Sequence, residues 1–144
     1  TLFAFVFFLT NANKSFAWTY SCFETDVVRI GLSVYKAPNG SVDIDVNQES
    51  VLITLTKNTK HGRFTCSGKI KLIGGYNDRN NFLAAGYGVD FSNQMTGTCF
   101  TGVWSLAMEE AVSYEPGSHK FNLAQVGGLS GGPRMSMGFC EIKN

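Results

Sequence analysis

The chain has 144 residues, 44% of them hydrophobic, and its 12 basic and 11 acidic residues leave a formal net charge of +1 at pH 7. A nearly neutral chain without a basic cluster lacks the electrostatic footprint of a nucleic-acid-binding protein, and nothing steers it towards an anionic membrane surface. We therefore expect neither nucleic acid nor a charged bilayer among its partners.

Residues 1–17 have the pattern of a secretory signal peptide. Residues 1–10 read TLFAFVFFLT, an uncharged apolar run, and residues 15–17 read SFA, a small-x-small cleavage site. No initiator Met or basic region precedes the run, so we expect a leader that is truncated at its start. The apolar run is too short to cross about 30 Å of hydrocarbon as a membrane anchor. We expect a secreted, extracellular protein whose single domain comprises residues 18–144, with no transmembrane segment.

The first half of this domain alternates in hydrophobicity with a period of two, which is typical of half-buried antiparallel strands. The apolar positions are Ile30, Leu32 and Val34, then Val42, Ile44 and Val46, then Val51, Ile53 and Leu55. The Pro-Asn-Gly turn at residues 38–40 predicts a hairpin between the first two runs. Turn residues at 58–62 close the third run, and a fourth strand is expected from residue 63 to residue 72.

The second half continues as strands separated by turns. Residues 74–81 are rich in Gly, Asn and Asp, and residues 81–85 could form one short helical turn. Further strands are predicted at residues 99–108, 120–126 and 134–143. A total of about seven or eight strands indicates an all-β domain, either a sandwich or a barrel. We expect an antiparallel, immunoglobulin-like β-sandwich stapled by disulfides.

The four cysteines and the one sequon of this domain fit an extracellular environment. An even number of cysteines in a secreted domain indicates disulfides, and Cys22, Cys66, Cys99 and Cys140 allow three pairings. We expect Cys22 to pair with Cys140, because they lie near the two ends of the domain, and Cys66 to pair with Cys99. No CxxC spacing supports a zinc site instead. Asn39 stands in an Asn-Gly-Ser sequon within a turn, where a glycan would be accessible.

The sequence offers few groups for catalysis or metal binding. Its two histidines, His61 and His119, lie in or beside turns, and we expect both to be exposed. There is no GxSxG nucleophile motif. Asp43, Asp45 and Asn47 imitate the first ligands of a calcium loop, but the glycine and the glutamate that complete such a loop are missing. We therefore expect no enzymatic activity, no cofactor and no metal.

Large apolar side chains are concentrated within residues 82–104. The candidate ligand-binding residues there are Phe82, Leu83, Tyr87, Phe91, Phe100 and Trp104. On a Gly- and Asn-rich segment such side chains could line the rim of a ligand cavity, and equally they could be ordinary core residues. Met135 and Met137 alternate near the end of the chain and allow the same two interpretations, packing around an apolar guest or filling the core.

Several segments carry a family resemblance. They are residues 16–18 with Cys22, the strands at residues 28–34 and 42–46, the strand at residues 50–56 followed by Cys66, and the closing pair at residues 117–123 and 134–142 with Cys140. Together they resemble the secreted ML lipid-recognition family, which includes the ganglioside activator and the secreted Niemann–Pick sterol carrier. This chain has fewer cysteines than that family, and its residues 67–116 have no clear counterpart. The resemblance implies a sandwich that sequesters an acyl chain or a sterol between its sheets, with residues 82–91 at the entrance.

A secreted interaction module that binds a protein or a glycan through its surface loops is the alternative function. The interior distinguishes the two functions, because a lipid carrier needs an apolar cavity of several hundred Å³. An interaction module is instead packed to a density of about 0.74 throughout. A membrane-active toxin is the weakest alternative, because residues 82–85 form only a short apolar loop.

Overall fold

A computed structural model of the chain describes residues 17–31, 33–37, 39–59, 62–75, 78–89, 102–126 and 133–143. These residues form nine strands and no helix. The strands are β1 (Trp18–Ile30), β2 (Val34–Lys36), β3 (Ser41–Val46), β4 (Ser50–Thr59), β5 (Gly62–Gly74), β6 (Phe82–Val89), β7 (Gly102–Glu110), β8 (His119–Val126) and β9 (Arg134–Lys143).

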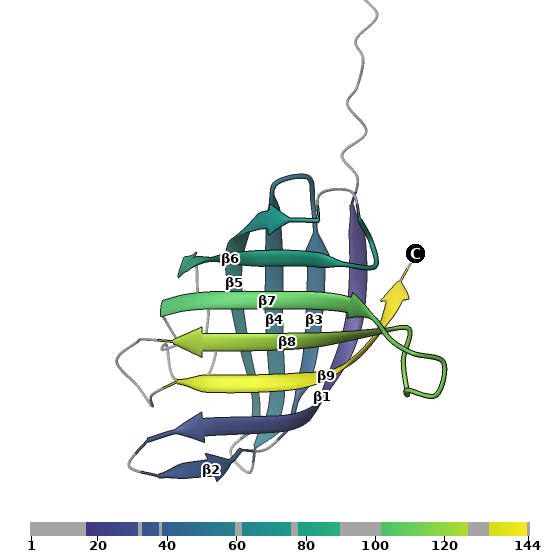
Figure 1. Cartoon of the computed structure of the whole chain (residues 1–144). Coiled ribbons are helices and arrows are strands. Elements are labelled where there is room, and N and C mark those ends of the chain that lie inside the picture. Colours follow the sequence, from purple (N-terminus) through teal and green to yellow (C-terminus); the bar gives the residue numbers. More distant parts are fainter. Residues whose placement is uncertain are drawn as a thin grey trace, which may run out of the picture.

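The strands form one antiparallel sheet that closes on itself as an eight-stranded barrel (Figure 1). From β3 to β9 each strand pairs with the next along the chain, and β1 pairs with both β3 and β9. The short β2 adds to the second half of β1. The expected all-β, antiparallel fold is confirmed. The expected immunoglobulin-like sandwich is not what the structure has: β1 pairs with β9 as well as with β3, which closes a single sheet into a barrel instead of leaving two separate sheets.

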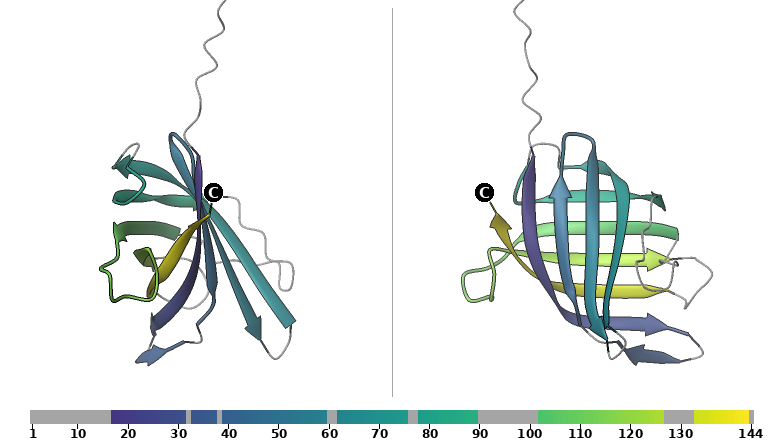
Figure 2. Two further views of the ribbon diagram at one scale, coloured as in Figure 1. Left: turned by 90° about the vertical axis from the view of Figure 1, so that its right-hand side faces the viewer. Right: turned by 180° about the vertical axis from the view of Figure 1, so that it is seen from behind.

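Two layers of strands cross steeply in this barrel. In Figure 1, β6, β7, β8 and β9 lie in front of β3, β4 and β5, and Figure 2 shows the same two layers from the side and from behind. The long β1 contributes to both layers, since its first half pairs with β3 and its second half with β2, while β9 follows it along most of its length. A register shift between Glu24 and Asp26 marks the β-bulge at which β1 bends.

The core consists of alternate residues from every long strand. Trp104, Tyr20 and Phe121 are its largest fully buried side chains. They meet in the interior because side chains alternate between the two faces of each strand, and closure of the sheet turns one face of every strand inward. The inner face of the barrel is therefore occupied by large side chains.

Three local expectations are wrong. The alternation across residues 29–34 is not one strand, because the chain turns after Ile30 and returns to pair Val34 with Ile30. The turn at residues 38–40 does not join a hairpin of the first two runs, because β3 pairs with β1 and β4. Residues 82–85 belong to β6 rather than to a helical turn, since Phe82 and Ala84 face the core while Leu83 faces outward.

The predicted Cys22–Cys140 disulfide is confirmed. The two cysteines are direct cross-strand partners on β1 and β9, at a sequence separation of 118. The bond therefore fastens together the two strands that close the barrel. Cys66 is also disulfide-bonded, and its predicted partner Cys99 lies outside the described residues.

Candidate functional site

The outer face of β6, β7, β8, β9 and the second half of β1 carries small and apolar side chains in three cross-strand rows. The middle row consists of Ala85, Ser105, Ala124, Met135 and Val28. One flanking row consists of Leu83, Ala107, Asn122, Met137 and Asp26. The other flanking row contains Tyr87, Val103 and Val126. Apart from Asp26 at one end, none of these residues carries a charge.

The middle row and the row that begins with Leu83 line a groove of about 420 Å³ on the surface of the barrel. Its floor is low because Ala85, Ala107 and Ala124 have short side chains at the centre of the face. Longer apolar side chains surround the floor, and each is about half exposed: Leu83 at 52%, Ile73 at 53%, Met135 at 54% and Met137 at 49%. Small residues between large ones give a hollow with apolar walls.

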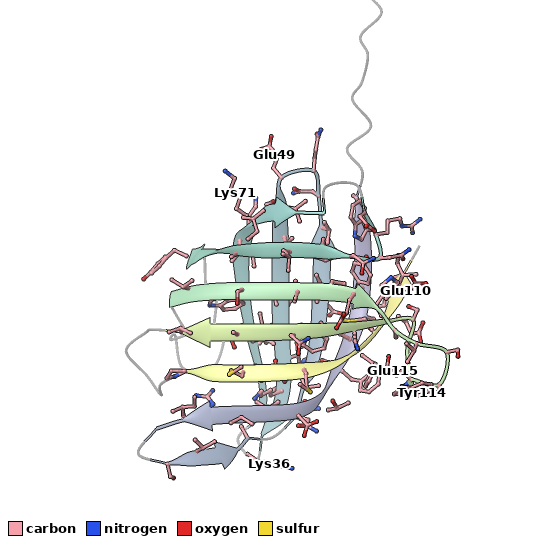
Figure 3. All side chains as sticks on the ribbon, in the orientation of Figure 1. Lys36, Glu49, Lys71, Glu110, Tyr114 and Glu115 are labelled. Atoms are coloured by element: carbon pink, nitrogen blue, oxygen red, sulfur yellow. A yellow bond between two sulfur atoms is a disulfide. The ribbon has the colours of Figure 1, made fainter. Side chains whose placement is uncertain are left out.

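Charged side chains lie at the margin of this face. Figure 3 shows Lys71 beyond one edge, Lys36 below, and Glu110 and Glu115 at the right-hand end, all away from the middle of β6 to β9. The outer face of β3 and β4 is different, since it carries polar side chains such as Asp43, Asp45 and Thr54. A contiguous exposed patch of apolar side chains usually marks a binding surface for a ligand, a protein or a membrane.

The structure separates the six candidate residues chosen from the sequence. Phe82 and Trp104 are buried in the core, at 2% and 0% exposure. Leu83 lines the groove, and Tyr87 is exposed in the flanking row. Phe91 and Phe100 lie outside the described residues. The two methionines, Met135 and Met137, are not core residues but form one wall of the groove.

The alanines of the groove floor were missed because nothing in their own side chains signals a site. The signal lies in the parity of the strands. Counting back from Cys140 in steps of two places Ser136 and Arg134 inside the barrel, and thus Met135 and Met137 outside. The same parity from Trp104 places Ala107 outside, opposite Leu83.

One end of the barrel interior is polar. Arg134 and Glu24 are buried and form an ion pair, and the second carboxylate oxygen of Glu24 accepts the Gly40 N–H at 3.0 Å. The Arg134 guanidinium also donates to Gln125 Oε1 and to Ser136 Oγ, both at 3.3 Å. Burial lowers the pKa of Arg134, while the Glu24 carboxylate raises it. These residues reach the interior from β1, β8 and β9.

The other end is closed by the segment before β6. The Tyr20 hydroxyl donates to the carbonyl oxygen of Arg79, and burial raises the pKa of Tyr20 to about 12. His119, expected to be exposed, is buried at 4% exposure, because the first residue of β8 already faces inward. Its Nε2 lies 2.9 Å from Asn80 Oδ1, and its ring meets that of Tyr20 edge to face. Burial lowers the pKa of His119.

Other expected features can be placed only in part. Asn39 is exposed, and its side-chain amide donates to the carbonyl oxygen of Thr25 at 3.2 Å, so glycosylation there stays a prediction. His61 lies outside the described residues. In the part of the chain that the structure describes, no group of three or more His, Cys, Asp or Glu side chains is arranged to hold a metal. Among the same residues, no helical segment has the length and apolarity needed to cross a bilayer.

Comparison of the chain with protein-family models, with curated proteins and with solved structures finds no match.

Proposed function

We propose that the chain is an extracellular binding protein, without enzymatic activity, that holds a lipid acyl chain or a sterol in the groove on the outer face of β6 to β9. The observation that carries this proposal is the hollow of about 420 Å³ with alanines at its floor and Leu83, Ile73 and two methionines as walls. Pockets for small molecules have volumes of about 300–1,000 Å³ and mostly apolar linings. The interior is the weaker location, because Trp104, Tyr20 and Phe121 occupy it.

The driving force would be the removal of apolar surface from water. Covering about 200 Å² of ligand and protein surface contributes about 5 kcal/mol, before the cost of association is subtracted. Met135 and Met137 suit this role, because unbranched thioether side chains adjust their shape to different guests. Kinship with the ML lipid-recognition family stays a prediction. It implies the same class of ligand but places that ligand between two sheets.

A titration with a fluorescent fatty acid tests the groove. We expect the oxidised, secreted chain to bind the probe saturably and Met137→Lys to weaken binding at least tenfold, because a charge would enter an apolar wall. The matched control is Leu52→Lys, which also removes a partly exposed apolar side chain, at 38% exposure, but on the outer face of β4. Equal binding by both variants, or no binding by the unmodified chain, would refute the proposal that the groove binds the fatty acid.

Docking of a protein partner on the same face is the second candidate. The observation that favours it is the row of Tyr87, Val103 and Val126, which extends the apolar face beyond the groove with exposures of 63%, 52% and 53%. A lipid in the groove leaves this row uncovered, whereas a protein can cover both. If Val103→Lys abolishes partner binding or self-association but leaves fatty acid binding intact, the row is a protein interface separate from the lipid groove.

A further inference from the structure

The groove on the outer face of β6 to β9 has one apolar end and one acidic end. The apolar end lies at β5 and β6, where Ile73, Leu83 and Ala85 line it. The acidic end lies at β1, where Asp26 lines the groove directly opposite Met137 of β9. Among the described residues that line the groove, the exposed Asp26 is the one that carries a charge. A bound ligand therefore meets a carboxylate at one end only.

The carboxylate of Asp26 is available to a ligand. Within the part of the chain that the structure describes, its side chain makes no hydrogen bond and no ion pair. Lys36 of β2 lies directly opposite Val28, the next outward-facing residue of β1, yet it does not pair with Asp26. An ionised carboxylate accepts hydrogen bonds and donates none. The acidic end of the groove therefore offers acceptors that the protein leaves unused.

The lysine at the apolar end does not line the groove. Lys71 of β5 lies directly opposite Ala85, but it lines a separate hollow beside the turn between β3 and β4, together with Glu49 and Ser50. Figure 3 shows Lys71 and Glu49 beyond the edge of β6. An anionic head group in the groove therefore meets the like charge of Asp26 and, among the described lining residues, no cation.

The uncharged polar side chains of the groove do not distinguish between head groups. They are Ser105 in the middle row and Asn122 in the flanking row, and both are exposed. A hydroxyl and a carboxamide each donate and accept hydrogen bonds, so either one suits a donor or an acceptor on the ligand. The choice of head group therefore depends on Asp26.

We propose that Asp26 selects lipids whose head group donates hydrogen bonds, a hydroxyl or an ammonium group, over lipids with an anionic head group. This inference rests on the proposed binding of a lipid in the groove. The head group lies at Asp26, and the apolar part extends over Ala124 towards Leu83 and Ile73. Hydrogen bonds to an ionised acceptor are stronger than neutral ones, and an ammonium donor adds its own charge. A carboxylate head group is repelled, so a fatty acid binds more weakly, through its chain alone.

Calorimetric titrations of the disulfide-bonded chain with decylamine, 1-decanol and decanoate test this selection. The three probes have the same chain length and differ in the head group, and at pH 7.5 the amine is cationic and the acid anionic. All are used below their critical micelle concentrations. We expect the amine to bind at least tenfold more tightly than the acid, with the alcohol between them. Equal affinities for the three probes, or tightest binding of the acid, overturn the inference.

Two variants and a control separate the head group from the groove. Asp26→Asn keeps the size of the side chain but removes its charge, and it should lower the ratio of amine to acid affinity at least fivefold. Asp43→Asn makes the same change of net charge on the outer face of β3 and should keep the ratio. Ala124→Leu fills the groove floor and should weaken all three probes by the same factor.

The outcomes distinguish this inference from the proposed function. If Ala124→Leu weakens all three probes while Asp26→Asn keeps the ratio, the groove binds lipids but Asp26 does not select them, and the inference is overturned. If none of the probes binds the unmodified chain, the proposed function fails and the inference fails with it.

Discussion

The burial of His119 should make the stability of the protein depend on pH. With the ring neutral and its proton on Nε2, it donates to Asn80 Oδ1, and its Nδ1 accepts from the Ser118 hydroxyl at 2.8 Å. Burial lowers the pKa of His119; Glu110 and Glu141 oppose this shift, and Arg79 adds to it. Ser118 Oγ also lies 3.2 Å from the Cys140 carbonyl oxygen, which accepts the hydroxyl proton when the ring carries a second proton.

The direction of the pH effect follows from this lowered pKa. In the unfolded chain His119 protonates near its ordinary pKa of about 6.5, whereas the folded chain resists protonation until the pH is lower. The unfolded state therefore binds more protons between those two values. The free energy of unfolding should fall as the pH drops through that window, by at most about 1.4 kcal/mol per pH unit for one group. Urea denaturation at pH 7.5, 6.5, 5.5 and 4.5 measures this slope.

The two histidines provide a matched pair of variants for that measurement. His119→Gln should lower stability at pH 7.5 but flatten the slope. His61→Gln should keep the slope of the unmodified chain. If the flattening follows His61→Gln instead, the assignment to His119 is wrong.

Residue identities alone predicted few of these environments. The side chain of His119 was expected to be exposed because it follows a Pro-Gly-Ser turn, yet it is the first inward residue of β8. Leu83 and Phe82 were grouped as one rim, although neighbours on a strand point to opposite faces. The groove floor could not be predicted from residue identities, because Ala107 and Ala124 become neighbours only through the pairing of the strands.

At the level of elements, the bend of β1 depends on a glycine of its partner strand. Gly138 of β9 lies opposite Glu24, next to the bulge between Glu24 and Asp26. A Cβ on Gly138 would collide with the backbone carbonyl of Phe23 and lie 2.9 Å from Phe121 Cε1. The close approach of the two backbones lets β1 pass from one layer of the barrel to the other.

Gly138→Ala should therefore destabilise the protein. Overpacking of this kind costs about 1–3 kcal/mol, and here the obstacle is backbone, which cannot rotate away as a side chain can. Gly74→Ala is the control, because a Cβ at that position meets nothing closer than 3.9 Å. Chemical denaturation of the two variants gives the comparison. Equal midpoints would mean that the bulge does not depend on a bare backbone at residue 138.

Elements were predicted where polar turns bound them and mispredicted where the alternation ran through a turn. The strands expected at residues 120–126 and 134–143 agree closely with β8 and β9. The run from Ile30 to Val34 has the pattern of one strand, because its apolar positions stay in phase while the chain reverses. A period of two in hydrophobicity predicts extended chain, but it does not show where the chain reverses its direction.

At the scale of the whole molecule, the decision between a sandwich and a barrel rests on one pairing. Both architectures need the same alternating strands, so alternation could not separate them. The pairing of β1 with β9 closes the barrel, and the sequence hinted at it only through Cys22 and Cys140 near the ends of the domain. Closure also explains the location of the candidate site, since it turns the large side chains inward and leaves the alanine-floored face outside.

The Cys22–Cys140 disulfide should accordingly stabilise the closure of the barrel above all. It spans 118 residues, and a loop of that length corresponds to about 5 kcal/mol in the chain-entropy model. We expect the double variant Cys22→Ser/Cys140→Ser to unfold at a clearly lower denaturant concentration under non-reducing conditions. Those conditions preserve the bond made by Cys66.

Hydrogen exchange shows where that stability is lost. Amides in the ladder of β1 and β9 should exchange much faster in the double variant, because this ladder is the seam that the disulfide fastens. The ladder of β4 and β5 is the internal control, since it is a hairpin of neighbouring strands that pair from Ser50 with Lys71 to Thr59 with Gly62. Its amides should speed up only as far as global unfolding requires. Uniform acceleration of both ladders would show that the disulfide stabilises the barrel as a whole and not its seam.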